Sequence, residues 1–197
     1  MTAERRKILF MLAEQKINVD EAEGLLDALQ HTPEMLPKLQ IDCITKHPPL
    51  LKTLEDARKA ASSNVPILIV GEPGTGKELV ARIIHQASPR RDKPFVPINC
   101  AAVPSVLLES ELFGHERGAF TGAIHRKIGQ IERTDGGTLF FDEIDELPPN
   151  VEFKLLQFMG SGKFERLGGS EFVSADVRIV AASHLGTEAL ANKLRRD

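Results

Sequence analysis

A glycine-rich turn that ends in a lysine, directly after a short apolar run, constrains this chain more than any other feature. The run Pro66–Val70 is unbroken and apolar, which is typical of a strand buried on both faces of a parallel sheet. Residues 71–78 follow with the sequence Gly-Glu-Pro-Gly-Thr-Gly-Lys-Glu, and a helical segment begins there. Glycines let backbone N–H groups curl around an anion, and the helix adds the positive end of its dipole. The pattern predicts a phosphate-binding loop.

Within this loop, Lys77 is the side chain that can reach the β- and γ-phosphates of a nucleotide. Other phosphate loops have a serine or threonine next, whose hydroxyl binds Mg²⁺, but here Glu78 takes that place. Because Mg²⁺ takes oxygen ligands and keeps several waters, water or Asp142 is expected to supply the missing ligand. The residues expected to bind the nucleotide in this loop are Gly71, Glu72, Pro73, Gly74, Thr75, Gly76, Lys77 and Glu78.

Two acidic residues follow a second apolar run, Thr138–Phe141. Ligands bind at such strand ends in open α/β sheets. We expect Asp142 to hold Mg²⁺ and Glu143 to polarise the attacking water, two roles that phosphoryl transfer requires. An acidic pair in this position is by itself more often a solvated strand end, and the phosphate loop upstream reverses that preference. For the next acids, Asp145 and Glu146, the sequence favours a surface position.

The rest of the main domain alternates strands with helices. Apolar runs at 95–98 and 177–182 predict further strands, and residues 78–87, 106–113 and 151–159 have helical spacing. This alternation predicts an α/β fold with a parallel sheet. The main domain is expected to cover residues 50–197.

Two smaller segments precede the main domain. Residues 1–30 predict a small helical hairpin, since Asn18 and Glu21 have the spacing of a capping box between two apolar stripes. Residues 31–49 contain four prolines and predict a linker.

Composition narrows the class of protein. A net charge of −3 excludes a globally basic nucleic-acid coat. The two cysteines, Cys43 and Cys100, lack the spacing of a disulfide framework or a zinc site, which favours a reducing compartment. No apolar run reaches the roughly 18 residues of a membrane span, and the first residues do not have the form of a signal peptide. We therefore expect a cytoplasmic protein without a membrane partner.

Residues 118–123 read Gly-Ala-Phe-Thr-Gly-Ala, a stretch that phosphate chemistry does not require. This GAFTGA motif is the hallmark of the sigma-54-dependent transcriptional activators, a branch of the AAA+ ATPases. Together with residues 71–78 and 137–143, the resemblance covers residues from about 45 to 197. It implies a three-layer P-loop NTPase core that uses ATP and Mg²⁺, assembles into a ring and contacts the sigma-54 factor of RNA polymerase through the GAFTGA loop.

The resemblance also implies roles for single residues. Lys77 is similar to the Walker A lysine, Asp142 and Glu143 are similar to the Walker B pair, and Glu78 is the usual residue at its position. Asn99 resembles the asparagine that holds the Walker B glutamate and releases it as the nucleotide changes. A strand-end capping amide is an equally natural interpretation of Asn99.

Further positions carry the resemblance into the two loops and the end of the chain. The expected sigma-factor contacts are Gly118, Ala119, Phe120, Thr121, Gly122 and Ala123. Residues 166–170 resemble a second loop that moves with the first. Ser183 and His184 stand where threonine and asparagine are most common in the γ-phosphate sensor, and His184 can still donate a hydrogen bond. Arg195 matches the first of two arginine fingers, which complete the nucleotide site of a neighbouring subunit.

The family pattern continues where this chain stops, at Asp197. The sequence therefore predicts an apparently truncated core without the last strand, the lid, the second arginine finger or a direct DNA-binding domain, with the strand at 66–70 on an open edge. Two functions remain open. One is an ATP-hydrolysing activator of sigma-54 RNA polymerase, and the other is a catalytically weak nucleotide-binding regulator that acts through partner binding. A different AAA+ remodeller is disfavoured because it does not need GAFTGA.

Overall fold

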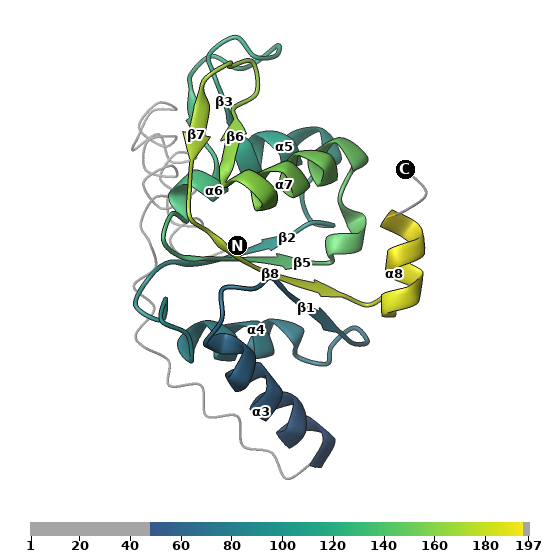
Figure 1. Cartoon of the computed structure of the whole chain (residues 1–197). Helices are drawn as coiled ribbons and strands as arrows, with labels where there is room; N and C mark the ends of the chain where they lie inside the picture. The colour runs from purple at the N-terminus through teal and green to yellow at the C-terminus, as the bar shows by residue number, and fades with distance from the viewer. Residues whose placement is uncertain (1–47, 195–197) are drawn as a thin grey trace, which may run out of the picture. The chain divides into compact units, whose positions relative to one another are not determined.

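The structure is a computed structural model that describes residues 48–194 (Figure 1). The expected hairpin at 1–30, residues 31–47 of the expected linker and Arg195 lie outside the described residues. The first described helix, α3, begins at Pro48, so the last two residues of the expected linker are helical. Among residues 48–194, no helix combines the length and the apolar character that a membrane crossing requires.

Four parallel strands form the central sheet in the order β1-β8-β5-β2. They span Ile67–Val70 (β1), Phe95–Asn99 (β2), Thr138–Asp142 (β5) and Arg178–Ser183 (β8). At the carboxyl ends, Val70 of β1 pairs with Ser183 of β8, and Asn99 of β2 pairs with Asp142 of β5. The segment after β8 therefore emerges between the segments that follow β1 and β5.

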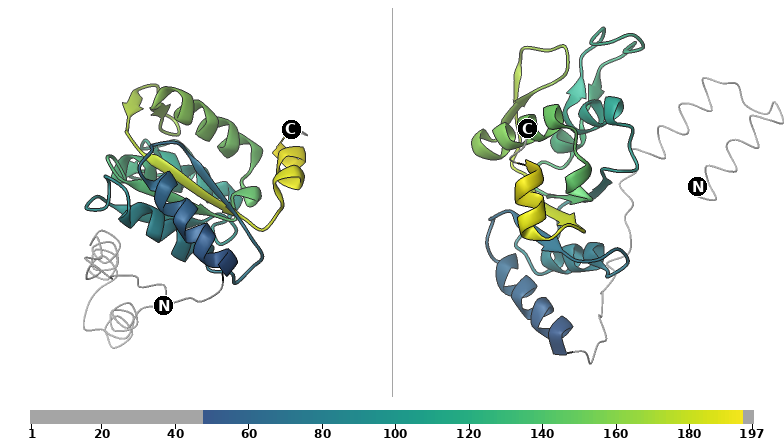
Figure 2. Two further views of the ribbon diagram at one scale, coloured as in Figure 1. Left: turned by 60° about the horizontal axis from the view of Figure 1, so that its bottom comes forward. Right: turned by 90° about the vertical axis from the view of Figure 1, so that its right-hand side faces the viewer.

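Helices cover both faces of this sheet (Figures 1 and 2). The helices α3 (Pro48–Ala61) and α4 (Lys77–Gln86) lie on one face, and α5 (Ser105–Phe113), α6 (Gln130–Arg133) and α7 (Pro149–Ser161) lie on the other. Side chains alternate along the strand, so Phe140 packs toward α4 while Leu139 and Phe141 pack toward α5 and α7. The predicted three-layer α/β fold is confirmed.

Short elements complete the described chain. A 3-10 turn, η1 (Ile144–Glu146), follows β5, and α8 (Thr187–Leu194) follows β8. Two small antiparallel pairs were not predicted from the sequence. They are β3 (Gly114–His115) with β4 (Lys127–Ile128) and β6 (Lys163–Glu165) with β7 (Phe172–Ser174).

The strand β1 lies at an edge of the described sheet, as expected, but it is not buried on both faces. Leu68 and Val70 are each 42% exposed, while Ile67 and Ile69 pack against the α3 and α4 side. The prediction of two-sided burial is therefore wrong for β1. An apolar run shows that a strand can be buried. It does not show that helices cover both faces of the sheet at that strand, and β1 lies at an edge of the described sheet.

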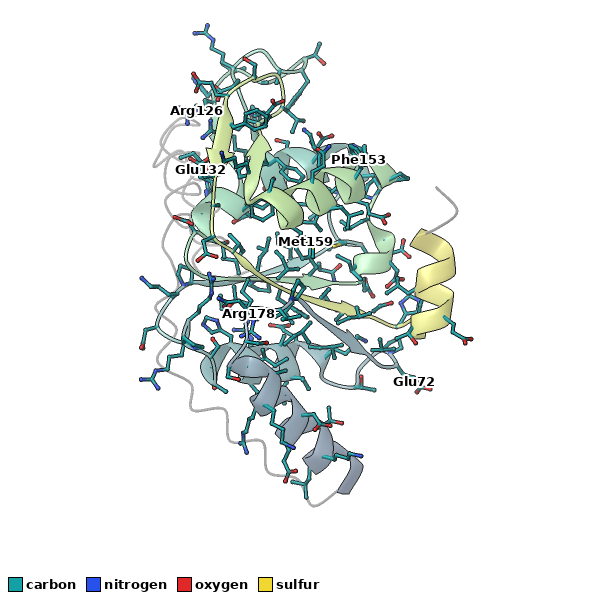
Figure 3. The ribbon with its side chains drawn as sticks, viewed as in Figure 1. Glu72, Arg126, Glu132, Phe153, Met159 and Arg178 are labelled. Carbon is teal, nitrogen blue, oxygen red and sulfur yellow. The ribbon has the colours of Figure 1, made fainter. Side chains whose placement is uncertain are left out.

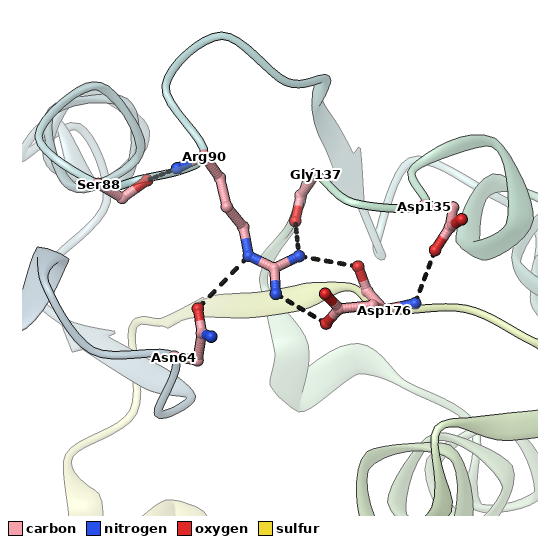
Figure 4. A network of polar contacts seen from close by, with 6 residues as sticks. All are labelled: Asn64, Ser88, Arg90, Asp135, Gly137 and Asp176. Carbon is pink, nitrogen blue, oxygen red and sulfur yellow. Dashed lines mark hydrogen bonds and ion pairs between the residues drawn. The ribbon is translucent and has the colours of Figure 1, made fainter.

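Two arginines fasten the amino ends of the strands. Arg178 is buried at the start of β8 and donates to Ala61 O at 2.7 Å and Ala60 O at 2.8 Å, at the end of α3 (labelled in Figure 3). This burial lowers the pKa of Arg178. Arg90 donates to both the carbonyl and the carboxylate of Asp176 and to Gly137 O (Figure 4). These contacts hold the strand ends that lie away from the predicted site.

Candidate functional site

The loop after β1 turns sharply into α4. Gly74 and Gly76 have φ angles of +78° and +81°, a left-handed conformation that glycine adopts without a steric penalty. Gly76 is the N-cap of α4, and the Thr75 hydroxyl donates to Glu72 O at 2.8 Å within the turn. The turn therefore brings exposed backbone to the amino terminus of a ten-residue helix, where N–H groups favour an anion.

Lys77 is the first residue of α4 and reaches back over this loop. Its ammonium donates to Gly71 O at 3.0 Å and to Glu72 O at 3.1 Å. Both acceptors belong to the loop itself, so the positive charge sits where phosphate oxygens of a nucleotide would compete with these carbonyls. Its ammonium therefore lies over the loop that the sequence predicts to bind phosphate.

Glu78 is directed along α4 and not into the loop. Its carboxylate accepts two hydrogen bonds from Arg82, at 2.9 Å from Nε and 2.7 Å from Nη2. The Arg82 guanidinium also lies 4.8 Å from the centre of the Phe95 ring. A carboxylate paired in this way is a poor candidate for Mg²⁺, so Glu78 does not replace the missing hydroxyl.

The acidic pair stands at the carboxyl end of β5. Asp142 ends the strand, and Glu143 follows with φ 54° and ψ 51°. Among residues 48–194, Glu143 is the one residue other than glycine with a positive φ. Such a conformation is costly for a residue with a Cβ, by about 1 to 3 kcal/mol, and it is found at functional sites. It turns the chain out of β5 and into η1, leaving both side chains half-buried at the sheet edge.

Asp145 is buried, and the expected surface position is wrong. Its Oδ1 accepts a hydrogen bond of 2.6 Å from the Ser183 hydroxyl, and its Oδ2 lies 3.4 Å from Nδ1 of His184. The reason is η1, which folds the chain back so that Asp145 faces β8. Glu146 is exposed, as expected. The spacing of apolar residues around Asp145 does not predict its burial. The one sequence feature that could have indicated it is Ser183, a polar residue at the carboxyl end of β8.

Asn99 ends β2 opposite Asp142 in the sheet register. Its side-chain oxygen accepts from the backbone N–H of Ala102 at 3.0 Å, which is the capping arrangement that the sequence left open. The next residue, Cys100, is buried. Burial, and then the nearby carboxylates of Asp142 and Asp145, raise the pKa of Cys100 to about 12, so its thiol stays protonated at neutral pH.

The end of β8 joins the two halves of the site. The backbone N–H of Gly71 donates to Ser183 O at 3.2 Å, which ties the start of the phosphate loop to β8. His184 follows directly, with its side chain 40% exposed. Three neighbouring strands therefore bring together the loop with Lys77, the imidazole of His184 and the acids Asp142 and Glu143.

The GAFTGA residues form a turn between β3 and β4. The N–H of Gly118 donates to Ala123 O at 2.8 Å and closes it, while Phe120 is 40% exposed and Thr121 is exposed. The Phe120 ring meets the His115 ring edge-on at 5.0 Å. In Figure 3, Arg126 and Glu132 mark this region and Glu72 marks the phosphate loop, on opposite sides of the sheet. The structure does not bring the GAFTGA turn into the phosphate site.

The second loop is attached to the base of the first. Glu116 N–H donates to Leu167 O at 2.9 Å, and Leu167 N–H donates to Gly114 O at 3.0 Å. Arg166 is buried and pairs with Glu132 of α6 at 2.7 Å and with Glu116 at 3.1 Å. These contacts connect the second loop, through both backbone and charge, to the residues that directly precede the GAFTGA turn.

A substitution at Gly168 measures how tightly the loops fit. Its φ is +70°, and a Cβ there would lie 2.7 Å from Ala119 Cβ, closer than packed carbon atoms approach. We expect Gly168→Ala to lower the free energy of unfolding by about 2 to 4 kcal/mol, from left-handed strain plus overpacking. The matched control is Gly136→Ala. Gly136 has a φ of +75°, and a Cβ there would lie 4.0 Å from Cδ of Lys93, so this change is expected to cost about 1 kcal/mol. Equal losses in denaturant titrations would contradict close contact between the loops.

The described side chains could contribute one carboxylate to a magnesium ion, with its other ligands coming from a nucleotide and water. Among the described residues, no group of three or more His, Cys, Asp or Glu side chains could hold a metal ion. Mg²⁺ at nucleotide sites is typically bound by one or two carboxylates together with phosphate oxygens and water. Asp142 at the end of β5 meets that requirement, so the residues present fit a metal that arrives with a nucleotide.

Curated relatives share most of this chain. The Nif-specific regulatory protein of Azotobacter vinelandii is 51% identical over 152 residues, which cover 76% of this chain and 29% of that protein. The DNA-binding transcriptional activator HyfR of Escherichia coli is 51% identical over 156 residues, covering 79% of this chain and 23% of HyfR. This chain therefore spans about a quarter to a third of the length of these relatives.

Solved structures share the fold. NtrX from Brucella abortus in complex with ATP has a TM-score of 0.70 at 28% sequence identity, covering 98% of this chain and 41% of that one. The P-loop NTPase domain of a sigma-54 activator from E. coli has a TM-score of 0.50 at 17% identity, covering 76% of this chain and 84% of that one, and supports the fold alone. The Sigma-54 interaction domain family matches residues 43–197. The chain therefore belongs to the sigma-54 interaction domain family of P-loop NTPases.

Proposed function

We propose that this chain binds and hydrolyses ATP and uses the GAFTGA loop to contact the sigma-54 factor of RNA polymerase, so that transcription is activated. The observation that carries this proposal is the arrangement at three adjacent strand ends, where Lys77, His184 and the pair Asp142–Glu143 share one edge of the sheet. A second functional loop stands apart from that edge, with its aromatic tip exposed.

Each residue has a distinct role in the proposed reaction. The exposed backbone at 71–76 binds the phosphates, and Lys77 exchanges its carbonyl partners for phosphate oxygens. Mg²⁺, when bound, neutralises phosphate charge, and Asp142 would hold it.

Glu143 orients the attacking water and takes its proton, while His184 contacts the terminal phosphate. Asn99 releases its cap to engage Glu143, and Arg195 reaches the site of a neighbouring subunit in a ring.

A continuous path connects the acids to the second loop. The turn η1 follows Glu143, α7 follows η1, and β6 follows α7 and ends one residue before Arg166. Three side chains of α7 are buried in the core, namely Val151, Leu155 and Phe158. We infer that a shift at the turn after β5 reaches the GAFTGA turn through α7 and Arg166.

Thr121→Ala tests the proposed sigma-factor contact. Thr121 is exposed in the turn between β3 and β4, outside the phosphate loop. Loss of a hydroxyl that hydrogen-bonds to the partner is expected to weaken sigma-54 binding by up to about tenfold while ATP affinity stays unchanged. Binding is measured with purified sigma-54 by interferometry in the presence of nucleotide. Thr187→Ala, which removes an exposed hydroxyl from α8, is the matched control. Equal sigma-54 binding by Thr121→Ala and the wild type would refute this role of the loop.

The dependence of ATPase rate on protein concentration separates the activator from the weak regulator. A rate per subunit that rises with concentration indicates that neighbouring subunits complete each other's sites. A flat rate close to zero, with ATP binding intact, favours the nucleotide-binding regulator that acts through a partner.

A further inference from the structure

We infer that Asp145 is a positioning residue that orients His184, so that the imidazole distinguishes ATP from ADP. This inference rests on the proposed function, because it assigns a partner to the side chain that is expected to meet the terminal phosphate. Neither the phosphate loop nor the Walker B pair requires a third buried acid at this edge.

The carboxylate of Asp145 is buried, and only one of its two oxygens accepts a hydrogen bond. Its side chain has 0% exposure, and Oδ1 accepts the 2.6 Å hydrogen bond from Ser183. Oδ2 is fully buried without a hydrogen-bond partner, and Nδ1 of His184 lies 3.4 Å from it. A buried carboxylate oxygen without a donor destabilises the fold, and a small rotation of the His184 ring would satisfy it.

This contact fixes which nitrogen of His184 serves a ligand. An ionised carboxylate only accepts hydrogen bonds, so the proton of the ring in this contact sits on Nδ1. Nε2 is then the nitrogen left for other partners, and the ring is 40% exposed. Metal-ligating histidines are oriented by carboxylates in the same way, through the ring nitrogen that does not meet the ligand.

The position of His184 next to the phosphate loop indicates that Nε2 would meet a phosphate group. β8 lies between β1 and β5, and Ser183 O accepts the N–H of Gly71 at the start of the phosphate loop. A phosphate oxygen only accepts hydrogen bonds, so Nε2 would meet it as a donor while Nδ1 faces the carboxylate of Asp145.

The test compares affinities for Mg-ATP and Mg-ADP by calorimetry in the full chain. Asp145→Asn keeps the size of the side chain and removes its charge. It is expected to weaken ATP binding by about tenfold and to leave ADP binding within about twofold. Glu188→Gln, which removes an exposed carboxylate from α8, is expected to change neither affinity. An unchanged ratio of the two affinities in Asp145→Asn would overturn the inference.

Two further variants separate positioning from general support of the fold. Thr134→Ala removes a buried hydroxyl that donates to Gln130 O beside α6, so it is expected to lower the melting temperature but to keep the ratio of ATP affinity to ADP affinity. His184→Ala is expected to lower this ratio like Asp145→Asn, and combining the two changes adds no further loss. A ratio that falls equally in Thr134→Ala, or a full additional loss in the double variant, contradicts a role through His184.

A spectroscopic signature is available that a purely structural role would not produce. In ¹⁵N-labelled protein, the signals of the His184 ring are assigned by their loss in His184→Ala. The ring is expected to carry a proton on Nδ1, and to lose that preference in Asp145→Asn. The same preference in both proteins would contradict the inference. If the wild type does not bind ATP, the proposed function itself fails. Binding by the wild type with no effect of Asp145→Asn defeats only the inference.

Discussion

Glu143→Gln is expected to lower the rate of ATP hydrolysis by about a hundredfold to ten-thousandfold while ATP affinity changes by less than about twofold. General base catalysis contributes a factor of this size, and an amide cannot take a proton from water. Glu143 follows β5 directly, at the carboxyl edge of the sheet, and its backbone has a left-handed conformation. The measurement is phosphate release at saturating ATP, with affinity determined separately.

The neighbouring acid Glu146 provides the control for Glu143. Its side chain is exposed, three residues further along the same acidic run, and Glu146→Gln removes one negative charge with the same change in volume. We expect nearly normal hydrolysis from it. Equal losses in both variants indicate a general effect of charge, and normal hydrolysis in Glu143→Gln assigns the base to another residue.

Lys77→Ala is expected to weaken Mg-ATP binding by about a hundredfold or more. A hydrogen bond to a charged group contributes about 1.5 to 3 kcal/mol, and the ammonium has two acceptors within the loop that phosphate oxygens would replace. The folded state should be retained, because both acceptors are carbonyls of an exposed turn. Calorimetric titration measures the change.

Lys59→Ala serves as the comparison for Lys77→Ala. Lys59 is an exposed lysine of α3, 78% exposed and 3.9 Å from Asp56. The same loss of one positive charge there is expected to leave ATP affinity unchanged. Retained affinity in Lys77→Ala would show that the ammonium does not meet the phosphates.

The sequence was sufficient for the central layers of the fold. Buried parallel strands are continuous apolar runs, so β5 and β8 were visible directly, and amphipathic spacing located α4, α5 and α7 to within two residues. The burial of β1 was misjudged, because whether a strand face is covered depends on helices distant in the sequence. The two- and three-residue strands of the loops are too short to have a period of their own.

Sequence reasoning located the parts of the candidate site that are local in the chain. The loop at 71–78 depends on backbone geometry that glycine spacing reveals. The structure places it at the same sheet edge as the acids of β5, with the end of β8 between them. Asp145 was missed because its burial is decided by a turn after the strand and by the polar end of β8. For Asn99 the sequence allowed two roles, a partner of the Walker B glutamate or a strand-end cap. The observed contact of its side chain is one hydrogen bond, from the backbone N–H of Ala102, which corresponds to the cap.

Calorimetric titration of the purified wild-type chain with ATP in the presence of magnesium tests the central claim most directly. The arrangement of Gly71–Lys77 and Asp142 at one edge of the sheet predicts saturable binding of one nucleotide per chain, against a blank titration of buffer that gives no saturable heat. A protein that is folded by circular dichroism and yet shows no affinity for adenine nucleotides with magnesium would contradict it.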